Sequence, residues 1–269
     1  MKCIYERVVS FVFLALTILF LNSCVSQQAT QTTSPSSLTI EEYPLQDAPT
    51  VEPLTFTPTE GSQQDILAKH QQERNVPIPN NSMLFEGQPA FSVQAGNEEL
   101  MALESFTNTV TDQGTFQKDV VQVLKNRQVI FSIDTGDVSP INSLRGLWTY
   151  SDHWAIEVAH VTLNLVSNES PLEPIGEILQ DGESLNITNG YDQAFGFQLI
   201  KGKPFYFFQQ NGKIGISFDG EQSRLDYDQI LHYQCCSAAE LNPRIAPNMV
   251  SFFAQRLGKW YYVEIGVFE

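Results

Sequence analysis

The chain has 269 residues, of which 42% are hydrophobic and 17% are charged. Its 31 acidic residues outnumber its 15 basic residues, which gives a formal net charge of −16 with histidine neutral. An acidic surface of this kind repels nucleic-acid phosphates and anionic lipid head groups, so the composition excludes nucleic acid as a partner. The hydrophobic content is high enough for a globular core.

The first 24 residues have the order of a secretory signal. Lys2 and Arg7 form a cationic head, residues 8–21 are an almost unbroken apolar run, and Ser23 precedes a cysteine. The apolar run is shorter than the roughly 20 residues that a transmembrane helix needs to span the bilayer. It is followed by a small residue, as in cleaved export signals. We therefore expect the protein to act outside the cytoplasmic membrane.

The end of this signal, Leu21-Asn22-Ser23-Cys24, resembles that of a bacterial lipoprotein, although Asn22 departs from the small or aliphatic residue usual at its position. The resemblance covers residues 1–24 only. It implies removal of residues 1–23, a diacylglycerol thioether on Cys24, and anchorage to the outer leaflet of the cytoplasmic membrane or to the outer membrane. Two or three acyl chains hold a protein stably on a membrane, whereas one chain binds only marginally. The alternative is an ordinary signal peptide in which Cys24 is incidental.

Residues 24–79 are expected to be a lipidated N-terminus and a flexible acidic tether. The segment is rich in Ser, Thr, Gln and Pro and has few large apolar side chains, so burial cannot offset the entropy lost on ordering it. One short helix is predicted over Gln63–Arg74, because three residues of that segment share a face: Ile66, Leu67 and His70. The folded domain is then expected to comprise residues 80–269.

From residue 80 onward the sequence predicts one strand after another. Two β-rich runs flank a polar turn within Val120–Ile133, and Phe195–Phe218 has the pattern of a three-strand meander. Asn211-Gly212 is the dipeptide that best suits a two-residue hairpin, since both positions need a positive φ. We expect an all-β fold of antiparallel meander hairpins, arranged either as a β-propeller-like structure or as a two-sheet β-sandwich.

A weak internal repeat favours the propeller-like alternative. Residues 84–96 match residues 124–136 at an offset of 40, and further turns are expected near residues 152, 202 and 258. These spacings average close to the length of a propeller blade. Any chain of hairpins looks self-similar, however, so the repeat leaves both arrangements open. Met249–Leu257 fits a helix as well as a strand, and we expect a strand because the next residues continue as its hairpin partner.

The sharpest candidate site is His232-Tyr233-Gln234-Cys235-Cys236. In an oxidising compartment Cys235 and Cys236 can close a vicinal disulfide, whose strained ring could form an apolar plate for a ligand flanked by His232 and Tyr233. The alternatives are a structural turn or two buried thiols. A metal site at these residues lacks a fourth ligand, so we expect neither a metal nor a cofactor.

Aromatic and acidic residues supply the remaining candidates. Trp154 and Tyr206 belong to a set of aromatics that could line a carbohydrate or peptide groove, with core packing as the alternative. Three acidic clusters, at Asp134/Asp137, Asp219/Glu221 and Asp226/Asp228, lie beside glycines or in turns, where Asp is favoured for local hydrogen bonds.

Together these features predict a lipid-anchored, extracytoplasmic binding or interaction module of a bacterial cell envelope. Its ligand would be a small molecule, a glycan or a protein, and its membrane contact would be the lipid. The chain lacks the G-x-S-x-G, H-E-x-x-H and G-x-G-x-x-G motifs, so an enzyme is the less favoured class. The alternative is an exported glycosidase-like hydrolase that uses a carboxylate pair.

Overall fold

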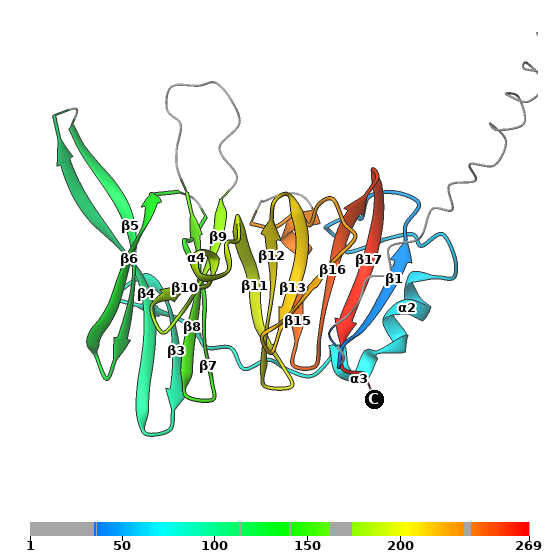
Figure 1. Cartoon of the computed structure of the whole chain (residues 1–269), viewed down its shortest axis with the longest axis horizontal. Helices are drawn as coiled ribbons and strands as arrows, with labels where there is room; N and C mark the ends of the chain where they lie inside the picture. Colours follow the sequence, from blue (N-terminus) through cyan, green and yellow to red (C-terminus); the bar gives the residue numbers. More distant parts are fainter. Residues whose placement is uncertain are drawn as a thin grey trace, which may run out of the picture. The chain divides into compact units, whose positions relative to one another are not determined.

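The computed structural model describes residues 35, 37–112, 114–139, 141–161, 174–233 and 238–268. Within them the chain forms four antiparallel sheets, most of whose strands pair with their sequence neighbours (Figure 1). The predicted all-β fold of meander hairpins is confirmed. A search of these residues for a helix with the length and apolar character of a membrane span finds none.

The first two sheets occupy the first half of the folded chain. The first sheet consists of β2 (Ser82–Phe85), β3 (Gln88–Ala95), β4 (Glu98–Thr111), β5 (Gly114–Lys125) and β6 (Gln128–Asp137). The second consists of β7 (Leu144–Tyr150), β8 (His153–His160), β9 (Ile175–Gln180) and β10 (Glu183–Ser184), and the short helix α4 (Leu185–Asn189) follows it.

The other two sheets are built the same way, with one difference. The third sheet consists of β11 (Gln193–Ile200), β12 (Lys203–Gln210), β13 (Lys213–Phe218) and β14 (Glu221–Arg224). The fourth consists of β15 (Arg244–Ala246), β16 (Met249–Arg256), β17 (Lys259–Gly266) and β1 (Thr39–Pro44), and the 3-10 helix η1 (Ala238–Leu241) precedes it. The fourth sheet is therefore closed by a strand from the other end of the chain.

Strand β1 corrects the expectation of a tether over residues 24–79. It pairs with β17 in antiparallel register from Thr39↔Gly266 to Pro44↔Tyr261. Its acidic residues, which indicated a solvated segment, have partners: Glu42 accepts hydrogen bonds from Arg256 (Nη2–Oε1 2.6 Å) and from the Tyr227 hydroxyl (2.6 Å). The ordered domain thus begins well before residue 80. Residues 1–34, which comprise the signal segment and the first part of the predicted tether, lie outside the described residues.

Two short helices cover the outer face of the fourth sheet. The predicted helix is present as α2 (Gln63–Lys69) and α3 (Gln71–Arg74), interrupted at His70. The Ser62 hydroxyl caps α2 by accepting from the Asp65 backbone N–H. Ile66 packs into a hydrophobic cluster with Phe253 and Tyr262 of the sheet. This packing corrects the expectation that the predicted helix belongs to a flexible tether.

The four sheets pack face to face in series. One hydrophobic cluster joins β4 and β5 to β7–β9, a second joins β8 and β9 to β11 and β12, and a third joins β11–β13 to β16 and β17. Buried glutamates add polar ties between neighbouring sheets. Glu104 of β4 accepts from the Leu144 backbone N–H (2.8 Å), and Glu157 of β8 accepts from that of Phe197 (2.7 Å). In each case the N–H donor belongs to the first strand of the following sheet, β7 or β11.

The predicted hairpin turns are present, but the internal repeat does not correspond to successive propeller blades. Asn211 and Gly212 adopt φ of 53° and 67°, as a two-residue hairpin requires. Met249–Leu257 forms a strand through Arg256, as expected. Residues 84–96 and 124–136, however, both belong to the first sheet. Their similarity reflects two hairpins of one sheet rather than two successive units.

Candidate ligand-binding groove

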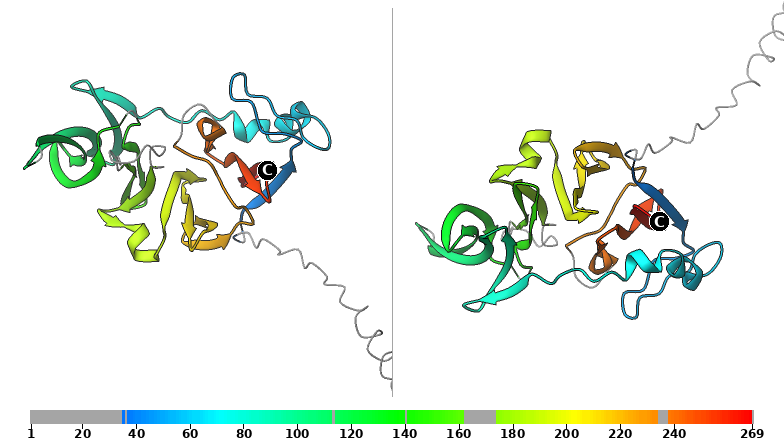
Figure 2. Two further views of the ribbon diagram at one scale, coloured as in Figure 1. Left: turned by 90° about the horizontal axis from the view of Figure 1, so that it is seen from above. Right: turned by 90° about the horizontal axis from the view of Figure 1, so that it is seen from below.

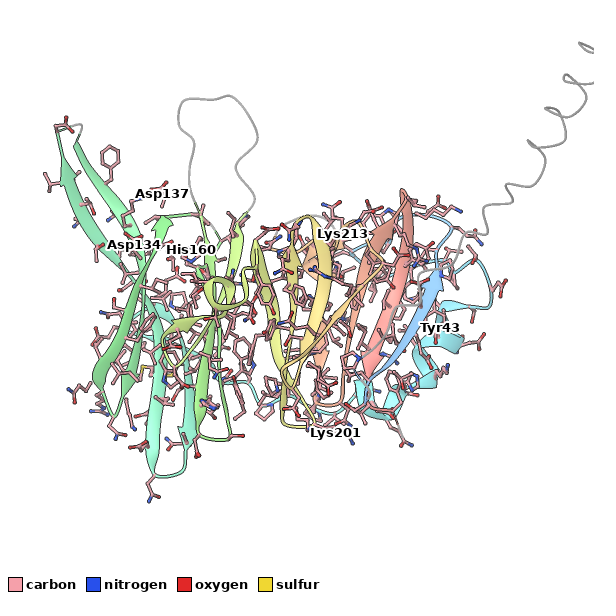
Figure 3. The ribbon with its side chains drawn as sticks, viewed as in Figure 1. Tyr43, Asp134, Asp137, His160, Lys201 and Lys213 are labelled. Atoms are coloured by element: carbon pink, nitrogen blue, oxygen red, sulfur yellow. The ribbon has the colours of Figure 1, made fainter. Side chains whose placement is uncertain are left out.

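All four sheets contribute to one apolar pocket of about 420 Å³. Its walls come from β3, β7, β11 and β15 and from the segment between α3 and β2; the lining side chains include Val93, Leu147, Trp148, Leu199, Ile245 and Ile78. This volume lies in the range of small-molecule sites, which are lined mostly by apolar side chains with a few polar groups. The pocket reaches Lys201, which Figure 3 shows at the end of the third sheet opposite Lys213.

Gln198 is the most deeply buried polar residue that lines this apolar pocket. The residue is 2% exposed, and neither Nε2 nor Oε1 has a hydrogen-bond partner in the described residues. A β-bulge sets its place, because the β11–β12 register shifts between Phe195 and Gln198. Leaving a buried donor or acceptor without a partner costs about 1–3 kcal/mol. A ligand carrying both an acceptor and a donor would remove that cost.

Residues 75–81 form one wall of the apolar pocket. Ile78, Pro79 and Asn81 line it, and the Asn81 side-chain amide donates to the Leu147 carbonyl (2.9 Å). Figure 2 shows this segment in cyan, leading from the helices to the first sheet. Because it links the α2–α3 region to β2, the N-terminal segment and the four sheets together complete the pocket.

Trp148 and Ile245 line both the apolar pocket and a second, more polar pocket of about 470 Å³. Gly146 makes room for the Trp148 ring, since a Cβ at that position would lie 2.2 Å from Trp148 Cη2. The Trp148 and Phe197 rings pack with their centroids 5.0 Å apart. We call the two pockets together the central groove.

The polar pocket holds a buried carboxylate and a cation. Glu157 is 4% exposed, and it accepts from the Phe197 N–H and from the Tyr233 hydroxyl. Burial, and then the nearby Glu157 charge, raise the pKa of Tyr233 well above its ordinary value. The Arg145 guanidinium lies 5.0 Å from the Tyr233 ring centroid. Glu240 and Asn242 also line this pocket, so it can bind hydroxyl groups.

The two described residues of the predicted 232–236 site face different pockets. Tyr233 lines the polar pocket, whereas His232 lines a separate pocket of about 460 Å³. The His232 ring stacks on Phe195 (centroids 3.6 Å apart), and its Nδ1–H donates to the Ile230 carbonyl (2.8 Å). Burial lowers the pKa of His232 to about 4, so its ring is neutral at pH 7. Cys235 and Cys236 lie outside the described residues, and so does Cys24.

The other two predicted ligand residues lie elsewhere. Trp154 lines a pocket of about 690 Å³ between the first and second sheets, beside the His153–Asp181 pair (2.6 Å). Tyr206 is 7% exposed and packs with Phe197 and other aromatics in the core between the second and third sheets. Tyr206 lines none of the pockets named above. Its position therefore agrees with the alternative that this aromatic residue packs in the core. The predicted residues therefore do not form one site.

The acidic turn clusters have local partners. Asp134 accepts from the Gly136 N–H (2.8 Å), and Asp137 pairs with Lys118 (2.7 Å); Figure 3 shows both aspartates at one end of the molecule near His160.

Two further carboxylates, Glu104 and Asp119, are buried between the first and second sheets, and burial raises the pKa of each.

Sequence reasoning missed the groove residues Gln198, Arg145 and Glu157, whose spacing carries no motif. It also missed the one group of three metal-ligating side chains that the described residues bring together, Glu41, His70 and Glu264. Burial favours a raised pKa for Glu41, but hydrogen bonds from Lys69 and Tyr43 outweigh it and hold the pKa below its ordinary value. This cluster lies outside the central groove.

Comparison with models of protein families, with curated proteins and with solved structures finds no match for this chain.

Proposed function

We propose that this protein is an extracytoplasmic, non-enzymatic binding module, anchored to a bacterial membrane by lipid on Cys24, that binds an N-acetylated amino sugar in the central groove. One observation carries the proposal: Gln198, at an apolar pocket lined by all four sheets, has a buried amide with no hydrogen-bond partner among the described residues. The cost of such a buried amide is offset if a ligand pairs with it.

An acetamido group matches this pocket in shape and chemistry. Its carbonyl accepts a hydrogen bond and its N–H donates one, which is what the Gln198 amide needs. Its methyl group can be buried among the apolar side chains, here Leu147 and Leu199. The Trp148 ring offers a flat face against which a sugar ring can pack.

The adjoining polar pocket suits the hydroxyl groups of a second sugar. Its Glu157 and Glu240 carboxylates can accept from hydroxyls, and Arg145 can donate to them. Removing residues 1–23 leaves 30 acidic and 13 basic residues, a net charge of −17. That charge favours a neutral saccharide over an anionic ligand.

Calorimetric titration of the purified protein with di-N-acetylchitobiose tests the proposal. We expect binding that is at least about tenfold tighter than that of cellobiose, which has hydroxyls in place of the acetamido groups. Gln198→Leu should abolish this difference. Trp154→Phe, in the separate pocket between the first and second sheets, is the matched control and should leave binding unchanged. Equal affinity for both sugars, or full binding by Gln198→Leu, contradicts the proposal.

A glycosidase is the second candidate, because two carboxylates, Glu157 and Glu240, line the same pocket. Glycoside hydrolysis uses such a pair on either side of the scissile bond. Both oxygens of Glu157 already accept hydrogen bonds within the protein, a structural arrangement that favours binding over catalysis. Mass spectrometry of di-N-acetylchitobiose after incubation distinguishes the two: monosaccharide that forms with the wild type but not with Glu157→Gln would indicate a hydrolase.

A further inference from the structure

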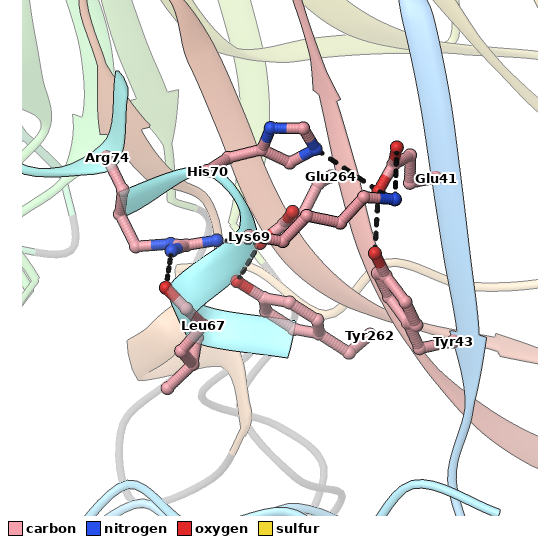
Figure 4. A network of polar contacts seen from close by, with 8 residues as sticks. All are labelled: Glu41, Tyr43, Leu67, Lys69, His70, Arg74, Tyr262 and Glu264. Carbon is pink, nitrogen blue, oxygen red and sulfur yellow. Dashed lines mark hydrogen bonds and ion pairs between the residues drawn. The ribbon is translucent and has the colours of Figure 1, made fainter. Parts of the chain in front are cut away.

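A second polar cluster lies on the outer face of the fourth sheet, beneath the two helices. Glu41 projects from β1, Glu264 from β17, and His70 from the junction of α2 and α3 (Figure 4). One ligand atom from each lies within 4.8 Å of the other two. Imidazole nitrogen and carboxylate oxygen are ligands that zinc and its neighbours among the transition metals bind.

Among the described residues, two buried atoms of this cluster lack a hydrogen-bond partner, and one of them, His70 Nε2, keeps only an ion-pair contact. Glu264 is 0% exposed and its Oε2 makes no hydrogen bond, while its Oε1 accepts from Arg74 and from the Tyr262 hydroxyl (2.8 Å). His70 is 8% exposed, and its Nε2 makes no hydrogen bond although it lies 3.2 Å from Glu41 Oε2. A buried carboxylate oxygen without a partner is uncommon, and a cation bound between Glu264 Oε2, His70 Nε2 and Glu41 would contact all three side chains.

The two cations already present differ in how firmly they are held. Arg74 is fixed by the Leu67 carbonyl and by Glu264 Oε1, which leaves the other Glu264 oxygen available. Lys69 Nζ lies 2.7 Å from both oxygens of Glu41, but its side chain is 52% exposed. Lys69 can therefore move into water when a metal ion takes its place, whereas Arg74 can stay.

We propose that Glu41, His70 and Glu264 bind one divalent transition-metal ion, for which Zn²⁺ is the best match. Bonds of about 2.0–2.2 Å place tetrahedral ligand atoms about 3.4 Å apart, so the three side chains need to converge by little more than about 1 Å. The His70 ring is oriented by stacking on Phe268, with centroids 3.6 Å apart. Because the ligands come from three separate elements, the ion ties β1 and the helices to β17 and stabilises the closed fourth sheet.

The test uses the full chain, stripped with EDTA and then titrated with ZnCl₂ alone. We expect about one zinc per chain and a rise of several degrees in Tm at saturating zinc. His70→Gln should abolish the zinc-dependent rise. His160→Gln, which removes a half-exposed His–Glu pair with Glu177 (2.6 Å) instead, is the matched control and should retain it.

A second variant keeps all three ligands and removes the competing cation. Lys69→Met should bind zinc more tightly than the wild type, by about fivefold or more, since zinc no longer has to displace the ammonium group. The absence of a zinc-dependent rise in Tm in both the wild type and Lys69→Met overturns the proposal. So does zinc binding that survives in His70→Gln and Glu264→Gln, which would place the ion at other residues.

Discussion

Replacing Gln198 by leucine should make the protein more stable and abolish its preference for the acetamido sugar. Neither the donor nitrogen nor the acceptor oxygen of the buried amide has a partner within the part of the chain that the structure describes. Burial of such groups costs about 1–3 kcal/mol, and leucine has a similar size without polar atoms. We therefore expect Gln198→Leu to raise the free energy of unfolding by about 1–3 kcal/mol, or Tm by roughly 2–10 °C.

Urea unfolding followed by tryptophan fluorescence measures the effect, with Gln193→Leu as the matched control. Gln193 lies on the same strand, and its amide donates to Gln209 Oε1 (2.8 Å), so the same substitution there should lower stability by about 1 kcal/mol. A loss of stability in Gln198→Leu comparable to that in Gln193→Leu would refute the reasoning, because it would mean that the Gln198 amide has partners within the folded protein.

Three further perturbations test other parts of the structure. His232 has a pKa of about 4, below the ordinary value of 6.5, so the unfolded chain binds its proton first and stability is lost as the pH falls through 6.5 towards 4. We expect a loss of about 2 kcal/mol between pH 8 and pH 5 that His232→Phe lacks, measured by urea unfolding at both pH values. Burial raises the pKa of Asp119, so its ionisation costs stability as the pH rises from about 4 through the raised value. Asp119→Asn should therefore gain stability relative to the wild type between pH 4 and pH 8, and an unchanged difference across this range would contradict the burial of a charge. Cys24→Ser should abolish incorporation of a labelled fatty acid in bacterial cells, whereas labelling that persists would show that the lipid is attached elsewhere.

Local sequence signals predicted most of the strands and their turns. Asn211-Gly212 and Lys201-Gly202 adopt the positive φ values that two-residue hairpins need, and both were readable from the dipeptides alone. Alternation and turn chemistry act between neighbours in the chain, so they indicate a meander reliably.

The same signals could not predict β1. Its partner strand lies more than 200 residues away in the chain, and its charged residues are neutralised by side chains from other elements, Lys69 and Arg256. From composition alone, such an acidic segment is indistinguishable from a solvated tether. Only the three-dimensional structure shows the Lys69 and Arg256 side chains that pair with its carboxylates. The α2–α3 region is a similar case. Its helix was predicted from the sequence, but its packing on the fourth sheet was not.

The groove could not be predicted either, for a related physical reason. Gln198 becomes a candidate only because a bulge and the packing of four sheets bury its amide without a partner, and no residue spacing encodes that outcome. Tyr206 is the opposite case. Its aromatic ring is chemically suited to a sugar-binding site, but it is buried in the hydrophobic core. Tyr233 was singled out for its neighbouring cysteines, whereas in the structure its hydroxyl donates to Glu157 and its ring lies near Arg145 and His232.

The most direct test of the central claim is a crystal structure of the protein grown with di-N-acetylchitobiose. The account predicts an acetamido group in the apolar pocket, with its carbonyl oxygen and its nitrogen each about 2.7–3.2 Å from the Gln198 amide and a sugar ring against Trp148. A sugar bound at another place, or a groove whose Gln198 amide is already paired with protein atoms, would contradict it.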